Sequence, residues 1–462
     1  MPENTYDLIV IGGGAGGVAA AIRASQLGGR VALVEDKYLG GLCMNRGCIP
    51  FGHMMAASHF LGTIPMAKEM GIGCSRVTTD FAVLLRRQNE LVQFMRQGAQ
   101  GLLNKNKITL IPARGKLAGP GKVSVKGKLL TAKRIILATG SRWLKPDFPD
   151  SDMAQVVNSD YLLTADRLPE RCLLYGTSPM IIEIAQFLQR FGSRVWLVLG
   201  EEALIAGEEK AVRTRLSKAI QAQGITVFTS AKILGLKKKR DGVDAILKGK
   251  DGKKQVIAVD LVISLRRGAA LEGLGLKAAG LDEKTGFVQV NDRMETGVKG
   301  LYAIGDVAAP ETRHYSHLAS AGGIVAAENA MGLDSRLNHR IMTRVIYMHP
   351  QVACVGLTSG EAKQAGFETV VGSAPFSMNP MGMILGQNEG IAVVVAEKKY
   401  GEVLGVHLIG EGAAEMAGQA VLAIQMEATL EELARVPFPH PTLSESLAEA
   451  ARDALGRPIY LP

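Results

Sequence analysis

The sequence predicts an α/β protein in three parts: two strand–helix–strand units followed by a separate α+β block. The first unit opens with strand 6–11, which leads directly into a glycine-rich run. The second repeats the pattern from residue 172, and an antiparallel pattern replaces it from residue 343. Strands that alternate with helices are typical of parallel sheets. We therefore expect two α/β regions and one region with its own antiparallel sheet.

Apolar periodicity and turn signals place the elements along the chain. The helix over 80–104 is expected to begin at Asp80, whose side chain can cap the first turn. In the first two parts the expected elements are strands 6–11 and 30–35 around a helix that ends near residue 27, helix 80–104, strand 172–175, helix 179–191, strand 194–199, helix 208–223, strand 262–264 and helix 317–331. The third part has expected strands 345–347, 370–376, 391–396 and 403–408 and helices 412–426 and 442–455.

Composition excludes a disordered chain, because 47% of the 462 residues are hydrophobic and can form full cores. The net charge is +9, but the densest basic cluster, 237–240, fits a solvated hairpin end, so nucleic acid is not expected and an acidic partner protein is the alternative. The apolar run 8–22 is too short for a membrane span, and no secretion signal is expected. Five cysteines do not indicate an extracellular disulfide framework, so a cytoplasmic protein is expected, with Cys74, Cys172 and Cys354 as buried thiols.

The glycine motif has the context of a dinucleotide site. Gly12, Gly14 and Gly17 follow a strand and open a helix, and Glu35 ends the next strand. Gly12 is expected to make the tight turn, Gly14 to let backbone amides approach a pyrophosphate, and Gly17 to let the helix pack closely. Glu35 would accept hydrogen bonds from ribose hydroxyls. The motif predicts a Rossmann-like site for FAD or NAD, with a glycine-rich packing turn as the alternative.

Two cysteines and a distant histidine are the candidate chemical groups. Cys43 and Cys48 can close a small disulfide loop, and a helix that begins beside them would favour a thiolate. Two thiols without a second pair of ligands make a poor zinc site, so no metal is expected. His440 with Glu445 could act as a general acid or base toward a substrate thiol. A single histidine such as His440 is more often a structural residue. A catalytic role is favoured here by its combination with Glu445 and the cysteine pair.

Together these motifs resemble those of the FAD-dependent pyridine nucleotide-disulfide oxidoreductases, flavoproteins with a redox-active cysteine pair, and most closely their dihydrolipoamide dehydrogenase-like members. The resemblance covers essentially the whole chain. It is carried by the Gly12–Gly17 motif with Glu35, Gly41-Leu-Cys43, Gly47-Cys48-Ile-Pro50, Ala138-Thr-Gly-Ser141, Ala303-Ile-Gly-Asp306, Tyr347-Met-His-Pro350, Val355-Gly-Leu-Thr358 and His440-Pro-Thr-Leu-Ser-Glu445.

The resemblance implies that Cys48 faces the flavin of bound FAD while Cys43 exchanges with the substrate, a lipoyl-bearing protein or a small dithiol or disulfide. It also implies a homodimer, in which His440 and Glu445 reach the cysteines of the other subunit. The implied FAD-binding residues are Gly12, Gly14, Gly16, Gly17, Glu35, Gly115, Thr139, Gly140, Ser141 and Asp306.

The resemblance also implies domain boundaries. Residues 1–148 would form the first part of an FAD-binding domain, and residues 269–340 its second, central part. Residues 149–268 would form an NAD-type domain with a degraded fingerprint. Residues 341–462 would form the α+β dimerisation domain. The expected fold is therefore two Rossmann-like domains with a C-terminal dimerisation domain.

The second unit keeps the spacing of the first but loses its chemistry. The positions equivalent to the three motif glycines and Glu35 are Gly176, Ser178, Ile181 and Leu199. Ser178 is expected to crowd the backbone approach to phosphates, and Pro179 removes an amide there. Ile181 is expected to push the helix off the strand, and Leu199 cannot accept a ribose hydrogen bond. NAD(H) is therefore expected to bind weakly or not at all.

Two further departures concern charge. The family usually continues Cys-Ile-Pro with Ser-Lys, whereas this chain has Phe51 and Gly52, so Glu183 is expected to lose its usual lysine partner. Arg266 stands where the family has a glycine and could meet a phosphate. The interpretation is an FAD-dependent dithiol oxidoreductase with an acceptor other than NAD. The alternatives are an ordinary NAD-dependent enzyme with a divergent pocket and a redox-silent flavoprotein subunit.

Overall fold

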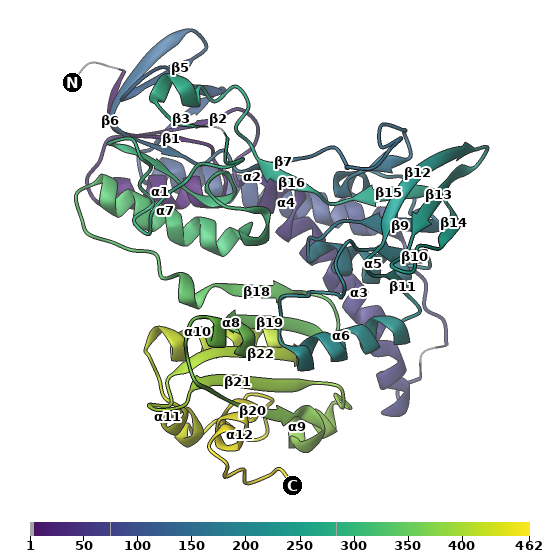
Figure 1. The fold of residues 1–462 in the computed structure, drawn as a ribbon. Coiled ribbons are helices and arrows are strands. Elements are labelled where there is room, and N and C mark those ends of the chain that lie inside the picture. The colour runs from purple at the N-terminus through teal and green to yellow at the C-terminus, as the bar shows by residue number, and fades with distance from the viewer. Residues whose placement is uncertain (1–3, 74, 283) are drawn as a thin grey trace.

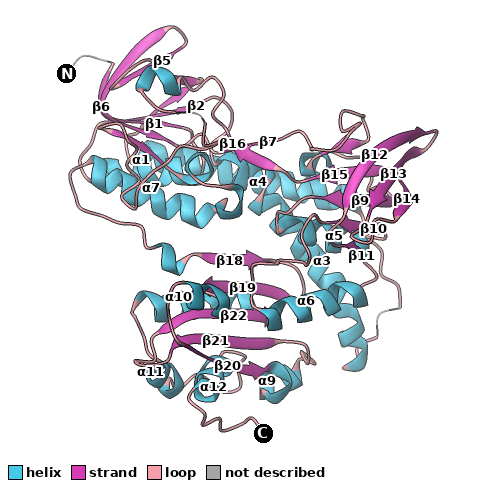
Figure 2. Cartoon of the chain, in the orientation of Figure 1, coloured by secondary structure: helices cyan, strands magenta, loops and turns pink. Residues whose placement is uncertain are grey.

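The computed structural model describes residues 4–73, 75–282 and 284–462. Figure 1 shows two α/β regions in the upper part of the view and an α+β region below them. Helices cover the sheets in each region, as the cyan and magenta elements of Figure 2 show. This arrangement agrees with the three parts that the sequence predicts.

The first region is built on a seven-stranded, mostly parallel sheet. Strand β1 lies between β2 and β6 and pairs with both in parallel. Strand β17 then pairs with β6, so the chain returns to this sheet after it has built the second region. The strands are β1 (Thr5–Ile11), β2 (Val31–Glu35), β3 (Thr109–Pro112), β4 (Gly115–Leu117), β5 (Lys122–Val125), β6 (Lys128–Leu137) and β17 (Leu301–Ala303).

Helices α1 and α7 cross closely beside this sheet (Figure 1). A Cβ atom on Gly16 would lie 2.6 Å from the carbonyl oxygen of Ala319, and one on Gly323 would lie 2.4 Å from that of Gly16. The crossing therefore requires glycine at both positions. The expected cap of α4 is present, since the Asp80 side chain accepts from the Val83 amide at 3.0 Å. The helices of this region are α1 (Ala15–Gln26), α2 (Gly41–Arg46), α3 (Cys48–Glu69), α4 (Phe81–Lys105) and α7 (Ser316–Ala330).

The second region contains a five-stranded parallel sheet in the order β11-β10-β9-β15-β8 and an antiparallel sheet of β12, β13 and β14. Residues 237–240 lie at the end of the β12–β13 hairpin, as expected. Two short antiparallel strands, β7 and β16, connect the first and second regions. The elements are β7 (Ser141–Trp143), β8 (Val156–Val157), β9 (Arg171–Tyr175), α5 (Met180–Arg190), β10 (Arg194–Val198), α6 (Lys210–Ala222), β11 (Thr226–Phe228), β12 (Lys232–Lys239), β13 (Gly242–Lys248), β14 (Lys254–Val259), β15 (Leu261–Ser264) and β16 (Arg267–Ala269).

The third region is a five-stranded antiparallel sheet in the order β18-β19-β22-β21-β20 with helices around it. Strand β19 was not among the expected strands. Its inner residues are all buried, so it lacks the alternation that marks a half-exposed strand. The elements are β18 (Thr343–Ile346), β19 (Gln351–Gly356), α8 (Ser359–Gln364), β20 (Thr369–Pro375), α9 (Pro380–Ile384), β21 (Ile391–Glu397), β22 (Val403–Gly410), α10 (Ala413–Gln425), α11 (Leu430–Arg435) and α12 (Glu445–Ala454).

A largely buried ion pair joins the second region to the third, since the side chains of Arg344 and Glu208 are 20% and 12% exposed. Arg344 of β18 donates to both carboxylate oxygens of Glu208, at 2.5 and 2.8 Å. The Nδ1 atom of buried His407 lies 3.8 Å from the same carboxylate. Burial alone would raise the pKa of Glu208, but Arg344 and then His407 outweigh it and lower the pKa to about 2.

Two of the three cysteines outside the pair are buried, as expected, since Cys172 and Cys354 are at most 1% exposed. Cys74 lies outside the described residues. Within the described ranges, no helix combines the length and apolar character that crossing a bilayer requires.

Candidate functional site

A cavity of about 1210 Å³ runs from the first glycine motif past the two cysteines toward the second motif. It lies at the carboxyl ends of β1, β2 and β6, where parallel α/β sheets bind ligands. Cys43 and Cys48 line it. So do all ten residues predicted to bind FAD: Gly12, Gly14, Gly16, Gly17, Glu35, Gly115, Thr139, Gly140, Ser141 and Asp306.

The first motif has the close packing that its glycines predict. Gly12 has φ +110°, and a Cβ atom there would lie 2.2 Å from the carbonyl oxygen of Ala138. A Cβ atom on Gly17 would lie only 1.9 Å from the carbonyl oxygen of Gly12. At Gly14 the nearest neighbour of a Cβ atom would be 3.9 Å away, so the backbone at this position faces the open cavity. A pyrophosphate can therefore approach the amides that begin α1.

Glu35 ends β2 at the wall of the cavity. Its carboxylate accepts from the Gly13 amide at 2.7 Å and from the Lys37 amide at 2.8 Å. Burial raises the pKa of Glu35 more than these two hydrogen bonds lower it. Glu35 thus supports the glycine turn and also presents an acceptor to the cavity. Together with the open backbone at Gly14, this lining fits FAD.

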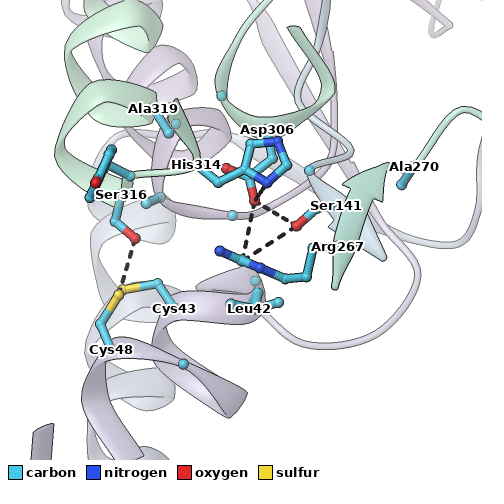
Figure 3. Close-up of a pocket in the computed structure, with 18 of the residues that line it drawn as sticks. Leu42, Cys43, Cys48, Ser141, Arg267, Ala270, Asp306, His314, Ser316 and Ala319 are labelled. Carbon is cyan, nitrogen blue, oxygen red and sulfur yellow. Dashed lines mark hydrogen bonds and ion pairs between the residues drawn. The ribbon is translucent and has the colours of Figure 1, made fainter. Parts of the chain in front are cut away.

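Four polar side chains of the cavity region lie close to one another (Figure 3). Ser141 donates to Asp306 at 2.6 Å, and the guanidinium of Arg267 lies 3.5 Å from both side chains. His314, which is almost fully buried, has its Nδ1 atom 3.8 Å from Asp306. Ser141 and Asp306 were predicted from the sequence, and the structure brings them together. A flexible ligand chain could reach the remaining acceptor capacity of Asp306.

Cys43 lies in α2, and Cys48 is the first residue of α3. Both are free thiols in the structure, and Cys48 is the more exposed to the cavity. The Sγ atom of Cys48 lies 3.2 Å from the hydroxyl of Ser316 at the start of α7 (Figure 3). Cys48 therefore lies beside a hydroxyl group at the N-terminal end of a helix. A thiolate there can accept from this hydroxyl, which favours the thiolate form.

The two thiols have opposite proton affinities. The hydrogen bond with Cys43 lowers the pKa of Cys48, burial opposes this, and Ser316 and the positive charge of Arg267 lower the pKa further. The same hydrogen bond, together with burial, raises the pKa of Cys43. In the reduced pair, Cys48 is therefore the thiol that loses its proton more readily.

The second unit differs at each substituted position. Leu199 and Ile181 are 5% and 2% exposed and belong to one apolar core, so neither side chain is available to a ribose or a phosphate. The cap position of α5 is Pro179, which has no amide hydrogen. Arg266 pairs with Asp147 at 3.1 Å instead of standing free for a phosphate.

His440 and Glu445 form the expected pair. His440 Nδ1 lies 2.9 Å from Glu445 Oε1, and the other carboxylate oxygen of Glu445 accepts from the Thr442 amide at 2.8 Å. The His440 side chain is 66% exposed. His440 and Glu445 belong to the third region and do not line the cavity beside the cysteines of their own chain.

The sequence interpretation missed Ser316 and His314. His314 lies in the segment between β17 and α7, and Ser316 is the first residue of α7, so both follow the carboxyl end of a parallel strand. That position is where ligand-binding residues gather in such sheets, and it could have drawn attention to them.

Comparison with known proteins agrees with this geometry. The profile of the pyridine nucleotide-disulphide oxidoreductases matches residues 6–332, and that family's dimerisation domain matches residues 342–451. The dihydrolipoyl dehydrogenase of Thermus scotoductus is 36% identical over 99% of both chains. That of Bacillus subtilis is 32% identical over 98% of this chain and 99% of its own. A leghemoglobin reductase of Glycine max is 32% identical over 99% and 89%, respectively. The chain therefore belongs to the pyridine nucleotide-disulphide oxidoreductase family, as a dihydrolipoyl dehydrogenase-like flavoprotein disulfide oxidoreductase.

Proposed function

We propose that this flavoprotein oxidises dihydrolipoyl-type dithiols through the Cys43–Cys48 pair and passes the electrons to an acceptor other than NAD. The observation that carries the dithiol chemistry is the reduced pair itself. Two free thiols, Cys43 and Cys48, lie in the same cavity as a complete dinucleotide cradle, and Cys48 contacts the Ser316 hydroxyl. The contacts of Cys48 lower its pKa. Bound FAD supplies an acceptor for two electrons.

The residues of this chain divide the work. A substrate thiolate attacks Cys43 of the disulfide, and Cys48 leaves as a thiolate that Ser316 stabilises with a hydrogen bond. His440, held by Glu445, takes the proton of the substrate thiol. His440 does not line the cavity of its own chain, so we propose that it acts on the cysteines of a second copy in a homodimer. The match of residues 342–451 to a dimerisation domain supports this proposal.

The weak use of NAD(H) rests on the second motif. Leu199 is buried and Pro179 lacks an amide, so two sources of dinucleotide affinity are missing. Arg266, which could have offset the loss, pairs with Asp147. We propose that residues 1–148 and 269–340 bind FAD, and that residues 149–268 retain the NAD-type fold with little affinity. Residues 341–462 would form the dimer. The second candidate is an ordinary NAD-dependent enzyme, which the names of the relatives favour.

Separate reduction by dihydrolipoamide and by NADH tests this proposal. Rapid mixing with dihydrolipoamide should bleach the flavin within the time of catalytic turnover, whereas NADH should bleach it much more slowly. Fast bleaching by both compounds would establish the NAD-dependent alternative. No bleaching by dihydrolipoamide would overturn the dithiol chemistry itself.

Two cysteine variants test the division of roles. In Cys43→Ser, the free Cys48 thiolate beside bound flavin should give a long-wavelength charge-transfer band without added reductant. Cys48→Ser should lack this band. Identical spectra would contradict the assignment of Cys48 to the flavin side.

Mixed dimers test the shared site. Cys43→Ser and His440→Ala chains should each be inactive alone. After subunit exchange, one of the two sites in each heterodimer has both residues intact, so activity should return. No recovery after verified exchange would contradict a site shared between subunits.

A further inference from the structure

Glu183 is a buried acid in the cavity of the cysteine pair. It lies in the first turn of α5, is 9% exposed and lines the same cavity as Cys48. Its Oε1 atom accepts from the Tyr347 amide at 2.8 Å. Among the described residues, no lysine, arginine or histidine lies within ion-pair distance of its carboxylate. A buried carboxylate with a single neutral donor is costly to keep ionised.

The groups that face Glu183 come from three elements. Cys48 lies on α3, which packs against α5, Tyr347 follows β18, and Tyr315 precedes α7. Burial raises the pKa of Tyr315 to about 12 and is also the largest of the effects that raise the pKa of Tyr347, so both phenols are neutral near pH 7. Cys48 is therefore the one neighbour among them whose charge changes with the redox state of the site.

The charge of Cys48 bears directly on Glu183. Burial raises the pKa of Glu183 to about 7, the Tyr347 amide opposes this, and the thiolate of Cys48 raises it further. When Cys43 and Cys48 form a disulfide, that negative charge is gone and the carboxylate is easier to ionise. By the reciprocity of linked equilibria, a neutral Glu183 in turn makes the Cys48 thiolate easier to form.

We propose that Glu183 is the proton partner of Cys48: it takes up one proton when the Cys43–Cys48 disulfide is reduced and gives it up when the disulfide re-forms. The proposal rests on the dithiol chemistry of the proposed function. It assigns to Glu183 a role in holding charge constant beside the flavin site, separate from that of His440, which acts during the attack on the disulfide.

The step balances in atoms and electrons. A substrate dithiol loses two electrons and two protons and forms its own S–S bond, while the S–S bond between Cys43 and Cys48 breaks. One proton ends on Cys43 and the other on Glu183. Cys48 keeps the released electron pair as a thiolate, so the cavity carries one negative charge before and after the step.

A substitution at position 52 can abolish proton uptake by Glu183 while Glu183 itself stays in place. Gly52 lies in α3 four residues after Cys48 and lines the same cavity as Glu183. A Cβ atom there would meet nothing within 4 Å, so a longer side chain has room. A lysine at this position would supply a cation to Glu183 and hold it ionised in both redox states.

The experiment reduces the holoenzyme with dithiothreitol near pH 7, in a weakly buffered solution, and records two signals. Infrared difference spectra should show a carboxylic acid band grow when the disulfide is reduced, and this change should vanish well above pH 7. A pH indicator should show clearly less than one proton released per disulfide for the wild type. Glu183→Gln and Gly52→Lys should both lack the band and release about one proton per disulfide.

Glu201→Gln is the matched control, because Glu201 also lines the cavity and burial also raises its pKa. This variant should behave like the wild type. Flavin content and thermal unfolding show whether each variant folds. If Glu183→Gln does not fold, Gly52→Lys still tests the proposal, because it retains Glu183. Proton release of about one from the wild type, or a band that persists in Glu183→Gln, would overturn this inference alone. A wild type without a reducible Cys43–Cys48 disulfide would overturn the proposed function as well.

Discussion

The two strand–helix–strand units of this chain, residues 5–35 and 171–198, share a backbone plan but differ at the turn where a dinucleotide would bind. Both turns begin with a glycine of positive φ, Gly12 at +110° and Gly176 at +145°. Helix α1 begins three residues after its glycine, at Ala15, whereas α5 begins four residues after its own, at Met180. The first unit thus starts its helix with an amide where the second has a proline without one.

The difference shows what each position contributes. Turn and strand geometry survive the loss of the second and third motif glycines, because an apolar core that includes Ile181 and Leu199 replaces the close packing. Affinity for a dinucleotide depends instead on a few backbone amides that a pyrophosphate can approach and on one carboxylate that can accept from a ribose. A fold can therefore be retained while its binding site is lost. The four predictions below, in order of decreasing effect, test this separation.

The largest effect is expected for Gly17→Ala. The new Cβ atom would lie 1.9 Å from the carbonyl oxygen of Gly12, so α1 must move away from the turn that would hold FAD. The purified variant should contain no flavin, as measured by absorbance. Gly101→Ala in α4 is the control, since a Cβ atom there meets nothing within 4 Å. Ile181→Ala, at the equivalent position of the second unit, should keep its flavin. Full flavin content in Gly17→Ala would contradict the packing argument.

The next effect concerns the ion pair that joins the second region to the third. Arg344→Ala leaves the largely buried Glu208 carboxylate without its cation, and the free energy of unfolding should fall by about 3 kcal/mol. Arg340→Ala is the matched control: it breaks a more exposed pair with Glu402 and should cost about 0–1 kcal/mol. Denaturant unfolding measures both. Equal losses would show that the buried pair has no special role.

The same pair predicts a pH dependence of stability. The pKa of Glu208 is about 2 in the folded chain and near 4.5 when unfolded, so the unfolded state binds the proton more tightly. The stability from this group is complete above about pH 4.5 and is lost as the pH falls toward 2. It amounts to about 3 kcal/mol. Unfolding free energies should decline less steeply with acid in Glu208→Gln. Parallel curves for the two proteins would contradict this assignment.

The smallest effect tests the lost site directly. Ser178→Gly with Leu199→Glu brings back two residue types of the first unit, a glycine and a carboxylate. An ionised carboxylate is costly to leave in the apolar core around position 199, so the new side chain should turn outward, where it can accept from a ribose. One charge-assisted hydrogen bond is worth about 1.5–3 kcal/mol, so NADH affinity should rise about tenfold to a hundredfold in a fluorescence titration. Ser178→Gly alone is the control for the backbone. Unchanged affinity in the double variant would place the block elsewhere, such as at Pro179.

Much of this could be predicted from the sequence, because glycine spacing and apolar periodicity report local geometry. The helix bounds of α1, α4 and α7 and the first glycine motif with Glu35 depend on such local signals. The full set of ten FAD-binding residues was implied by the family resemblance, and the structure gathers those ten around one cavity. Strand β19 escaped prediction, since a strand buried on both faces has no alternating pattern.

Contacts between distant segments could not be predicted in this way. Ser316 meets Cys48 across a sequence separation of 268 residues, and the pairing of Arg266 with Asp147 depends on how the first and second regions pack. The polarity of these side chains indicates that they need hydrogen-bond or ion-pair partners, but it does not indicate which residues those partners are. The absence of a cation beside Glu183 was expected, because this chain has Gly52 where the family has the lysine that pairs with this glutamate.

The late return of the chain to its first sheet has a consequence for synthesis. Strand β6 ends at Leu137, but its parallel neighbour β17 begins at Leu301, so ribosomes must translate the whole second region before that edge can be covered. Until then, part of β6 presents unpaired backbone groups, which invite association with other chains. The β7–β16 ladder brings the outgoing and returning segments side by side. Rapid folding of the second region would therefore shorten the time for which a nascent chain is prone to aggregate, whether or not that region still binds a nucleotide.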